Sequence, residues 1–314
     1  MKVAVLKGGS SLERTVSLRS GARVEDALAR LGHEVLPIDV GADLVDRLQI
    51  ERPNVAFVAL HGRGGEDGTV QELLELVGVP YTASRPGACI RCMDKVVAKH
   101  ALRDAGIPTP DFYAFSQAAF EELGAAKALP AIEERLGFPI VIKPAGQGSA
   151  LGIKFARSAA DVPNALISAF SYDSKVLLER YIPGRDLAVS VIDGPDGPQA
   201  LPVVEAIPTE EDFYDFEARY EIGRTRFVCP ADLSPELAER AQELALAAWR
   251  VLGCSGFARV DLMTDGEDLT VLEANAIPGL TATSLLPLAA EAAGIGFDDF
   301  VARVLDLAVQ RSPA

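Results

Sequence analysis

Cysteine, histidine and tryptophan are all scarce in this chain of 314 residues, which contains four, three and one of them respectively. So few cysteines, with no export signal, indicate reduced thiols in a cytoplasm rather than a disulfide framework. Cys89 and Cys92 have CxxC spacing, but no second pair and no histidine cluster accompanies them, while Cys229 and Cys254 are isolated in the sequence. The sequence therefore predicts small buried thiols around a helix start and argues against zinc binding or redox chemistry.

Basic residues are also in deficit, and no apolar run is long enough to span a bilayer. Lysine and arginine number 30 against 45 aspartates and glutamates, which gives a net charge of −15. This balance argues against nucleic acid or an anionic membrane as the main partner, although a phosphate ligand needs only local lysines and glycines. The N-terminal apolar run is too short for an export signal and predicts a buried strand. We therefore expect a cytoplasmic protein that binds small molecules.

The remaining composition, 49% hydrophobic and 24% charged, is typical of a globular protein large enough for two or three domains. Over the first ninety or so residues, apolar segments alternate with helical patterns, which predicts a doubly wound parallel sheet. The expected strands cover residues 2–6, 33–39, 55–60 and 79–81, and the expected helices cover 17–31 and 68–77. Ligands bind such sheets beyond the carboxyl ends of the strands, where residues 8–10 and 61–69 fall.

The rest of the chain predicts an α+β region with antiparallel strands. Strands are expected at 139–143, from 153, and at 176–181, 187–192 and 201–207, and helices at 94–105, 162–170, 234–252, 284–293 and 297–310. The helix at 234–252 has the clearest start, because Ser234 is an N-cap and a proline and an acid follow it. A polar stretch of little periodicity spans 208–226, and a loop of this size is usually functional or mobile.

A predicted antiparallel hairpin near the C-terminal end carries polar side chains at regular spacing. Because side chains alternate along a strand, Arg259 and Asp261 share one face, and so do Glu273 and Asn275. If the two faces coincide, two carboxylates, an amide oxygen and a guanidinium converge, and a hard cation such as Mg²⁺ prefers oxygen ligands of this type. An ordinary solvated face with a salt bridge is the alternative, and these residues alone do not decide between the two.

A glycine-rich stretch, Lys143–Gly152, is predicted to be a loop between two strands. Such a loop can fold over a polyphosphate with its N–H groups inward, while the lysine at its stem neutralises charge. It is neither a Walker loop nor a dinucleotide fingerprint, because a strand rather than a helix follows it; a plain β-turn is the alternative. Glu179 and Asp186 could hydrogen-bond a nucleoside, although surface carboxylates are common. His61 follows a buried strand beside several glycines, which favours a functional role over a structural one.

Seven motifs, taken together and in order, resemble the D-alanine–D-alanine ligase family of the ATP-grasp superfamily. They are Gly8–Gly21, Leu60–Thr69, Met93–Lys95, Lys143–Gly152, Phe213–Tyr220, Gly256–Asp261 and Glu273–Thr281. Each is moderately specific by itself, but they run through essentially the whole chain. The resemblance implies an N-terminal α/β domain at 1–94, then an ATP-grasp fold with a central subdomain at 95–181 and a C-terminal subdomain at 182–314 that carries a mobile loop at about 205–226.

The resemblance implies an ATP-dependent, ADP-forming carbon–nitrogen ligase that joins two D-alanines for peptidoglycan synthesis, and so serves cell wall biogenesis and cell shape. The carboxylate of the first D-alanine attacks the γ-phosphate of ATP, giving an acylphosphate and ADP. The amine of the second D-alanine then attacks the acyl carbon, and phosphate leaves. Two Mg²⁺ ions, which Mn²⁺ can replace, and a cytoplasmic homodimer are implied as well.

The same resemblance assigns roles to residues that match the family's motifs. Catalytic roles fall on Glu13, Ser149, Tyr220, Arg259 and Gly279, and D-alanine is bound by Glu13, His61, Arg219, Ser284 and Leu285. ATP is bound by Lys95, Lys143, Gly148, Ser149, Glu179, Arg180, Ile182 and Asp186, and the metal ions by Asp261, Glu273 and Asn275. Within this scheme Arg259 and the N–H of Gly279 form an oxyanion hole.

Two departures from the family pattern change geometry without removing a catalytic group. Asp186 stands where many members have glutamate, and Arg219 stands where a lysine often precedes the loop tyrosine. That tyrosine, Tyr220, favours a D-amino acid over D-lactate as second substrate. Two alternatives stay open: another ATP-grasp carboxylate–amine ligase, such as a D-alanine–D-serine or dipeptide ligase, and a catalytically silent nucleotide-binding protein. The metal ligands and Arg259 argue against the silent protein.

Overall fold

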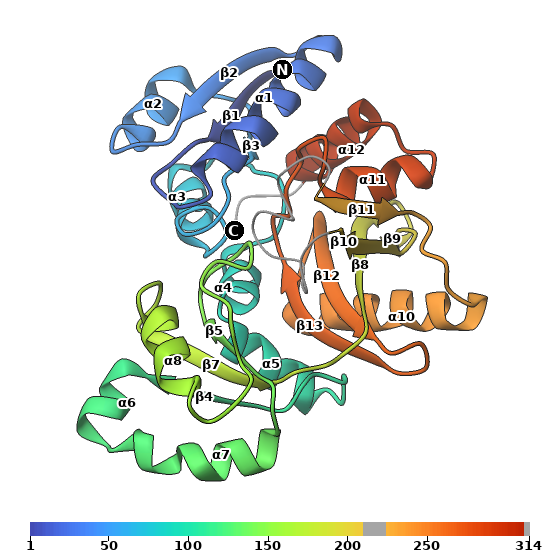
Figure 1. The fold of residues 1–314 in the computed structure, drawn as a ribbon. Helices are drawn as coiled ribbons and strands as arrows, with labels where there is room; N and C mark the ends of the chain where they lie inside the picture. The colour runs from blue at the N-terminus through green and yellow to red at the C-terminus, as the bar shows by residue number, and fades with distance from the viewer. Residues whose placement is uncertain (210–223, 311–314) are drawn as a thin grey trace.

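The computed structural model describes residues 1–209 and 224–310 and contains three β-sheets with helices packed on them (Figure 1). The N-terminal, central and C-terminal sheets are arranged around the centre of the molecule, and the chain passes from one sheet to the next there (Figure 1). This is the mixed α/β and α+β architecture that the sequence predicts. None of the described helices is both long and apolar enough to cross a membrane.

The N-terminal part is a parallel sheet of three strands in the order β2-β1-β3. Its elements are β1 (Lys2–Lys7), α1 (Arg14–Arg30), β2 (Glu34–Asp39), α2 (Leu44–Glu51), β3 (Val55–Val58), α3 (Thr69–Val77) and α4 (Pro86–Met93). The predicted strand at 79–81 is wrong, because only Tyr81 joins the sheet, through a single parallel bridge to Ala56. Helix α1 begins earlier than predicted, which places Glu13 at its N-cap.

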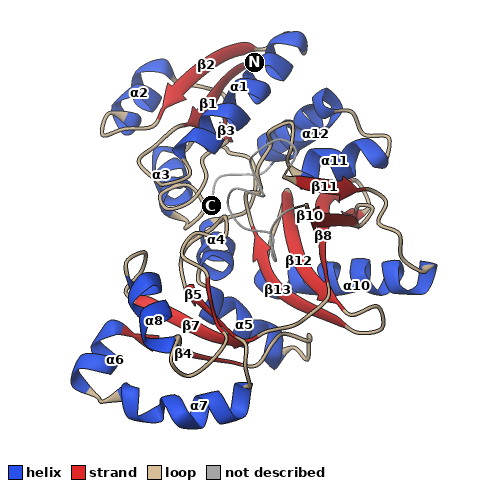
Figure 2. Cartoon of the chain, in the orientation of Figure 1, coloured by secondary structure: helices blue, strands red, loops and turns tan. Residues whose placement is uncertain are grey.

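The central part is an antiparallel sheet of four strands in the order β4-β7-β5-β6 (Figure 2). Its elements are α5 (Lys95–Asp104), β4 (Phe112–Ser116), α6 (Gln117–Glu122), a 3₁₀ helix (Ala125–Ala128), α7 (Leu129–Leu136), β5 (Ile140–Pro144), β6 (Lys154–Ala156), α8 (Val162–Phe170) and β7 (Lys175–Arg180). Helices α7 and α8 pack on the face that carries Ile140 and Ile142. The alternation of β5 and its pairing with β7 put Lys143 and Glu179 on the other face.

The C-terminal part is a largely antiparallel sheet in the order β11-β10-β8-β12-β13, with β9 paired to β8. Its elements are β8 (Arg185–Gly194), β9 (Gly197–Ala200), β10 (Val204–Pro208), β11 (Thr225–Val228), α10 (Pro235–Leu252), β12 (Phe257–Thr264), β13 (Leu269–Asn275), α11 (Leu285–Ala292) and α12 (Phe297–Gln310). The loop expected at about 205–226 is shorter at both ends than predicted, because Pro208 pairs with Thr225 and Ile207 with Arg226. Arg219 and Tyr220 lie outside the described residues.

Two hydrophobic clusters form the core. The larger one is continuous from the N-terminal sheet to the C-terminal sheet, and it includes Ala98 and Leu102 of helix α5. The smaller one belongs to the central sheet and its helices alone. The central sheet therefore has a core of its own, while the other two sheets share one. The predicted domain boundaries at 94/95 and 181/182 stay predictions.

Candidate active site

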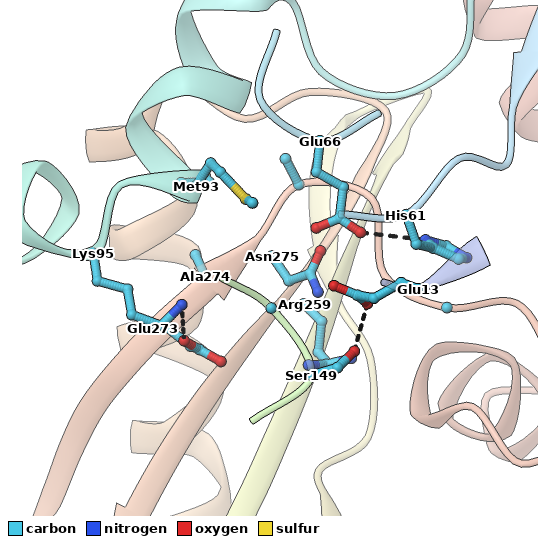
Figure 3. A pocket seen from close by; sticks show the side chains of 14 residues that line it. Glu13, His61, Glu66, Met93, Lys95, Ser149, Arg259, Glu273, Ala274 and Asn275 are labelled. Carbon is cyan, nitrogen blue, oxygen red and sulfur yellow. Dashed lines mark hydrogen bonds and ion pairs between the residues drawn. The ribbon is translucent and has the colours of Figure 1, made fainter. Parts of the chain in front are cut away.

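A pocket forms where the N-terminal part, the glycine-rich loop and the C-terminal hairpin meet (Figure 3). The predicted residues that line it are Glu13, His61, Lys95, Gly148, Ser149, Arg259, Glu273, Asn275 and Gly279. Five further residues, none of which was assigned a role from the sequence, line it as well: Glu66, Cys92, Met93, Ala274 and Ala276. Residues far apart in the sequence thus share one site, as expected of a ligand pocket between domains.

The two faces of the C-terminal hairpin coincide. Strands β12 and β13 are antiparallel, with Arg259 opposite Asn275 and Asp261 opposite Glu273, so the four side chains project to the same side. Arg259 forms a two-pronged ion pair with Asp261, with Nε–Oδ1 and Nη2–Oδ2 distances of 2.6 and 2.8 Å. These two side chains are only 10% and 13% exposed. A salt bridge is present, but on a largely buried face, so the alternative of a solvated hairpin face is wrong.

The donor set of this face suits a hard cation. Asp261, Glu273 and Asn275 offer two carboxylates and an amide oxygen, and both carboxylates are charge-compensated by protein cations. Arg259 forms an ion pair with Asp261, and Lys95 Nζ lies 3.0 Å from Glu273 Oε2. Within residues 1–209 and 224–310, no three His, Cys, Asp or Glu side chains gather as a metal cage. A cation held here must therefore complete its shell with water or substrate oxygens, as Mg²⁺ commonly does.

The backbone after β13 is held against the pocket by helix α1. Ser20 Oγ accepts the N–H of Leu280 at 3.1 Å. Arg23 donates to the carbonyl oxygens of Leu280 and Thr281 at 3.2 and 2.8 Å. These hydrogen bonds hold Leu280 at both its N–H and its carbonyl, directly after Gly279, which lines the pocket. Neither Ser20 nor Arg23 was singled out from the sequence, because their partners lie more than 250 residues away.

Ser284 and Leu285 are not among the residues that line the pocket. Ser284 precedes helix α11, but its hydroxyl turns back to accept the N–H of Thr281 at 2.9 Å and to contact the Thr281 hydroxyl at 2.8 Å. A Cβ atom at Gly279 would lie 2.8 Å from Ser284 Oγ, so the tight turn needs glycine there. The predicted contact of Ser284 and Leu285 with D-alanine stays a prediction.

Glu13 and Ser149 meet across the pocket from helix α1 and the glycine-rich loop. The side chain of Glu13 makes no capping bond at its helix end, and its Oε2 accepts a 2.5 Å hydrogen bond from Ser149 Oγ. Burial, reinforced by Glu66, raises the pKa of Glu13 to about 7, against the opposing effects of Ser149, His61 and Lys95. A Cβ at Gly148 would lie 2.6 Å from Glu13 Oε1, so glycine permits this close approach.

His61 lies at the carboxyl end of β3, as predicted, with its ring fully engaged. Nε2 is 2.9 Å from Ser20 Oγ, and Nδ1 is 3.2 Å from the Ile277 carbonyl and 3.3 Å from Glu66 Oε1. Glu66 is buried in the same loop. It lies in the glycine-rich segment at 61–69, a few residues after His61, and this position is the sequence signal that could have identified it as a pocket residue. The histidine therefore connects Ser20 on helix α1 with the backbone at the end of the hairpin.

The lysine at the stem of the glycine-rich loop is part of a buried charged chain. Lys143 Nζ lies 2.6 Å from Glu179 Oε1, and Lys99 Nζ lies 2.7 Å from Glu179 Oε2. Lys99 also donates to Thr109 Oγ1 at 2.6 Å. Burial alone would raise the pKa of Glu179, but the two lysines outweigh it and lower that pKa; burial lowers the pKa of Lys99 to about 8. Lys99 was not predicted, since a lysine in a helix ordinarily points to solvent.

The other residues predicted to bind ATP lie away from this pocket. Arg180 Nη2 donates to the carbonyl of Arg135 at 2.7 Å and lies 3.4 Å from Asp111 Oδ2. Ile182 lies on the segment between β7 and β8, and Asp186 lies on β8, opposite Met263 of β12. The structure does not bring these three together with the lining residues, so their contact with a nucleotide stays a prediction.

The chain is similar throughout to one protein family. The model described as D-ala D-ala ligase C-terminus matches residues 101–306, and the N-terminus model matches 43–84. It is 43% identical over 311 residues to a D-alanine–D-alanine ligase of Moorella thermoacetica, covering 99% of this chain and 100% of the relative. A Synechococcus sp. ligase is 44% identical over 316 residues, covering 99% and 95%.

Solved structures agree with these sequence matches. The crystal structure of D-alanine–D-alanine ligase from Bacillus anthracis superposes with a TM-score of 0.84 at 34% identity, covering 99% of this chain and 98% of that one. A structure of the same ligase complexed with ATP superposes with a TM-score of 0.83 at 32% identity, again covering 99% and 98%. The whole fold, and not one domain of it, is therefore shared.

Proposed function

The chain belongs to the D-alanine–D-alanine ligase family, and we therefore propose that it joins two D-alanines to D-alanyl-D-alanine with conversion of ATP to ADP and phosphate. The first D-alanine carboxylate attacks the γ-phosphate, so that an O–P bond forms and ADP leaves. The amine of the second attacks the resulting acyl carbon, loses a proton, and expels phosphate. The product serves peptidoglycan synthesis. A cytoplasmic location and a homodimeric assembly belong to the same proposal.

The observation that carries the proposal is the convergence of the hairpin face with the Glu13–Ser149 pair at one pocket (Figure 3). A carboxylate that attacks a triphosphate is repelled by negative charge, so cationic groups must neutralise both partners. Lys95 and Arg259 supply positive charge at the pocket, and both are nearly buried. In such a place, charge interactions are stronger than in bulk water.

Asp261, Glu273 and Asn275 are the residues proposed to hold two Mg²⁺ ions, for which Mn²⁺ can substitute. A bound ion would supply positive charge that offsets the negative charge of a phosphate. Lys95 and Arg259, which pair with Glu273 and Asp261 in the structure, are proposed to bind phosphate and the acyl oxygen respectively. The ion pairs in the structure thus hold the cationic side chains at the site before substrate arrives.

Arg259 and the N–H of Gly279 are proposed to stabilise the oxyanion of the tetrahedral intermediate. Glu13 is proposed to hold the ammonium of the first D-alanine, with His61 beside it. The N-terminus of the helix after Ser284 and Leu285 suits the carboxylate of the second D-alanine, because unpaired N–H groups gather there. Glu13 can bind an ammonium ion only as a carboxylate, which makes its raised pKa functionally relevant.

ATP is proposed to bind with its phosphates against Lys95, Lys143, Gly148 and Ser149, and with its nucleoside near Glu179, Arg180, Ile182 and Asp186. Two lysines pair with the carboxylate of Glu179 in the structure. When Lys143 turns to a phosphate, Lys99 keeps Glu179 paired. Arg219 and Tyr220, outside the described residues, are proposed to close the site over the phosphates and the second substrate.

Phosphate release in the presence of ATP, Mg²⁺ and D-alanine tests the proposal, with L-alanine as control. We expect phosphate to be released when D-alanine is added and not when L-alanine is added, and we expect D-alanyl-D-alanine among the products. Faster turnover with D-serine as second substrate would favour the alternative ligase, and turnover of D-lactate at the rate of D-alanine would contradict the role given to Tyr220. Absence of any D-alanine-dependent release would contradict the ligase function.

A further inference from the structure

Three of the four cysteines gather at one place in the fold. Cys89 and Cys92 lie on helix α4, and Cys254 follows helix α10, 162 positions beyond Cys92. All three are buried. The sulfurs of Cys92 and Cys254 are 3.6 Å apart, whereas the Cys89 sulfur contacts the carbonyl of Ser84 at 3.5 Å. The thiol pair is thus formed across the fold, and not within the CxxC spacing.

We propose that Cys92 and Cys254 are an oxidation site, at which a peroxide converts the two thiols into a disulfide that dithiols reduce again. The sulfurs are already in contact, and an S–S bond of about 2.05 Å requires only a small further approach. Burial keeps the thiols of other molecules away from the pair, and each of these two sulfurs is in contact with the other, whereas the Cys89 sulfur contacts the Ser84 carbonyl. The proposed ligase reaction assigns no role to either thiol, although Cys92 lines the same pocket, and this proposal does not depend on that reaction.

Cys254 is the sulfur that reacts first. The hydrogen bond between the two thiols, with help from Ser84 and Arg91, lowers the pKa of Cys254 although burial opposes the change. The same bond, together with burial, raises the pKa of Cys92. Since the thiolate is the reactive form, the lowered pKa favours attack by Cys254.

The reaction balances with one peroxide for each pair. The Cys254 thiolate attacks the O–O bond of hydrogen peroxide, so that an S–O bond forms, the O–O bond breaks, and hydroxide leaves and takes up a proton. Cys92 then attacks the Cys254 sulfur, the S–S bond forms, and a second water leaves. Two electrons and two protons have passed from the thiols to the peroxide, which becomes two waters.

The disulfide would close a loop that contains the entire central sheet. It joins the end of helix α4, at the entrance to the central part, to the chain just before β12 of the C-terminal sheet. A cross-link over so long a segment restricts the unfolded chain strongly. The oxidised protein should therefore unfold at a temperature several degrees higher than the reduced protein.

The test treats the full chain with stoichiometric hydrogen peroxide. We expect the intact mass to fall by two hydrogen atoms, non-reducing peptide mapping to recover a Cys92–Cys254 linkage, and dithiothreitol to restore both mass and unfolding temperature. Cys229→Ser, at a half-buried cysteine remote in sequence from the pair, is the matched control and should behave like the parent. In Cys92→Ser, a sulfenic acid at Cys254 should be trapped by dimedone.

Three results would overturn the proposal: a linkage that includes Cys89, over-oxidation of Cys254 without a linkage, or the same loss of mass in Cys254→Ser as in the parent. Cys254→Ala, which keeps an apolar side chain at the buried position, serves if the serine variant does not fold. Mass and linkage are measured without substrate, so a failure here is distinguishable from a failure of the ligase assay.

Discussion

Glu13 is the residue at which stability and the proposed function conflict most directly. Its side chain is buried at the start of helix α1, and burial raises its pKa to about 7 from an ordinary value of 4.5. The native state therefore binds the Glu13 proton more tightly than the unfolded chain does. This contribution to stability is complete below pH 4.5 and is lost as the pH rises toward 7. Above pH 7 the protein holds a buried carboxylate that its fold disfavours.

We expect Glu13→Gln to stabilise the protein at pH 8 and to inactivate it. The gain is at most roughly 3.5 kcal/mol in the free energy of unfolding, because each pKa unit corresponds to ~1.4 kcal/mol, and it should vanish toward pH 4.5. Activity should fall a hundredfold or more, since a neutral amide holds an ammonium ion poorly. Urea unfolding at several pH values and the kcat/KM for D-alanine measure the two effects.

Glu122→Gln is the control, because Glu122 is exposed on helix α6. It should change neither stability nor activity at any pH. In the parent protein, the kcat/KM for D-alanine should decline as the pH falls through about 7, where Glu13 becomes protonated. A flat profile down to pH 5, or a Glu13→Gln variant that retains activity, would contradict the role of this carboxylate.

At the scale of elements, helix α1 positions the turn that carries Gly279. We expect Arg23→Met to reduce kcat roughly tenfold to a hundredfold, because the carbonyls of Leu280 and Thr281 lose their donor and small displacements at an active site are costly. The KM for ATP should stay unchanged, since Arg23 does not contact the glycine-rich loop. Initial rates with each substrate varied separately measure both quantities.

Arg19 offers a matched control on the same helix, because it is an exposed arginine one turn away. Arg19→Met should leave kcat as it is. Arg23 also stacks on the ring of Phe297, with its guanidinium carbon 3.9 Å from the ring centre. A loss of stability without a loss of kcat would mean that Arg23 serves only this packing and does not position the turn.

Helix α5 and strand β7 are joined by the buried pair of Lys99 and Glu179. We expect Lys99→Met to destabilise the protein by about 3 kcal/mol, because Glu179 then remains buried with one lysine for two oxygens. Adding Glu179→Gln should recover part of that loss, since no uncompensated carboxylate remains. Thermal or urea unfolding of both variants measures the change in the free energy of unfolding, and Lys127→Met, at an exposed lysine, is the control. Equal stability of Lys99→Met and the parent would rule out a structural role for the pair.

At the scale of the whole molecule, the central sheet has its own core and the other two sheets share theirs. Local opening with separate free energies is expected where cores are separate. We predict that amides of residues 112–180 exchange with solvent through an opening that leaves the other two sheets protected. Hydrogen exchange followed by mass spectrometry distinguishes this opening from global unfolding.

Ligand should couple the two cores, because the proposed ATP site draws groups from both. MgATP at a hundred times its Kd should raise the free energy of unfolding by about 2.7 kcal/mol and slow the separate exchange of the central sheet. ADP without metal should give a smaller increase in the free energy of unfolding and a smaller decrease in the exchange rate of the central sheet. Equal protection of all three sheets before ligand is added would contradict the separate opening.

Much of this molecule follows from sequence, because local patterns determine local structure. The strands and helices around the motifs appear near their predicted places, and residues two apart on β12 and β13 share a face because side chains alternate along a strand. The family resemblance named nine of the residues that line the pocket, from the same motifs. The elements that were not predicted from the sequence, such as α2, α4 and β4, are short.

Only the tertiary structure decided how those local pieces meet. The register that sets Asp261 opposite Glu273 depends on the pairing of two strands, and no single strand contains that information. The burial that raises the pKa of Glu13, the buried Lys99 beside Glu179 and the contact between Cys92 and Cys254 all arise between segments distant in the chain. Such contacts depend on how the three sheets pack against one another, whereas a sequence pattern determines only the local structure of the segment that contains it.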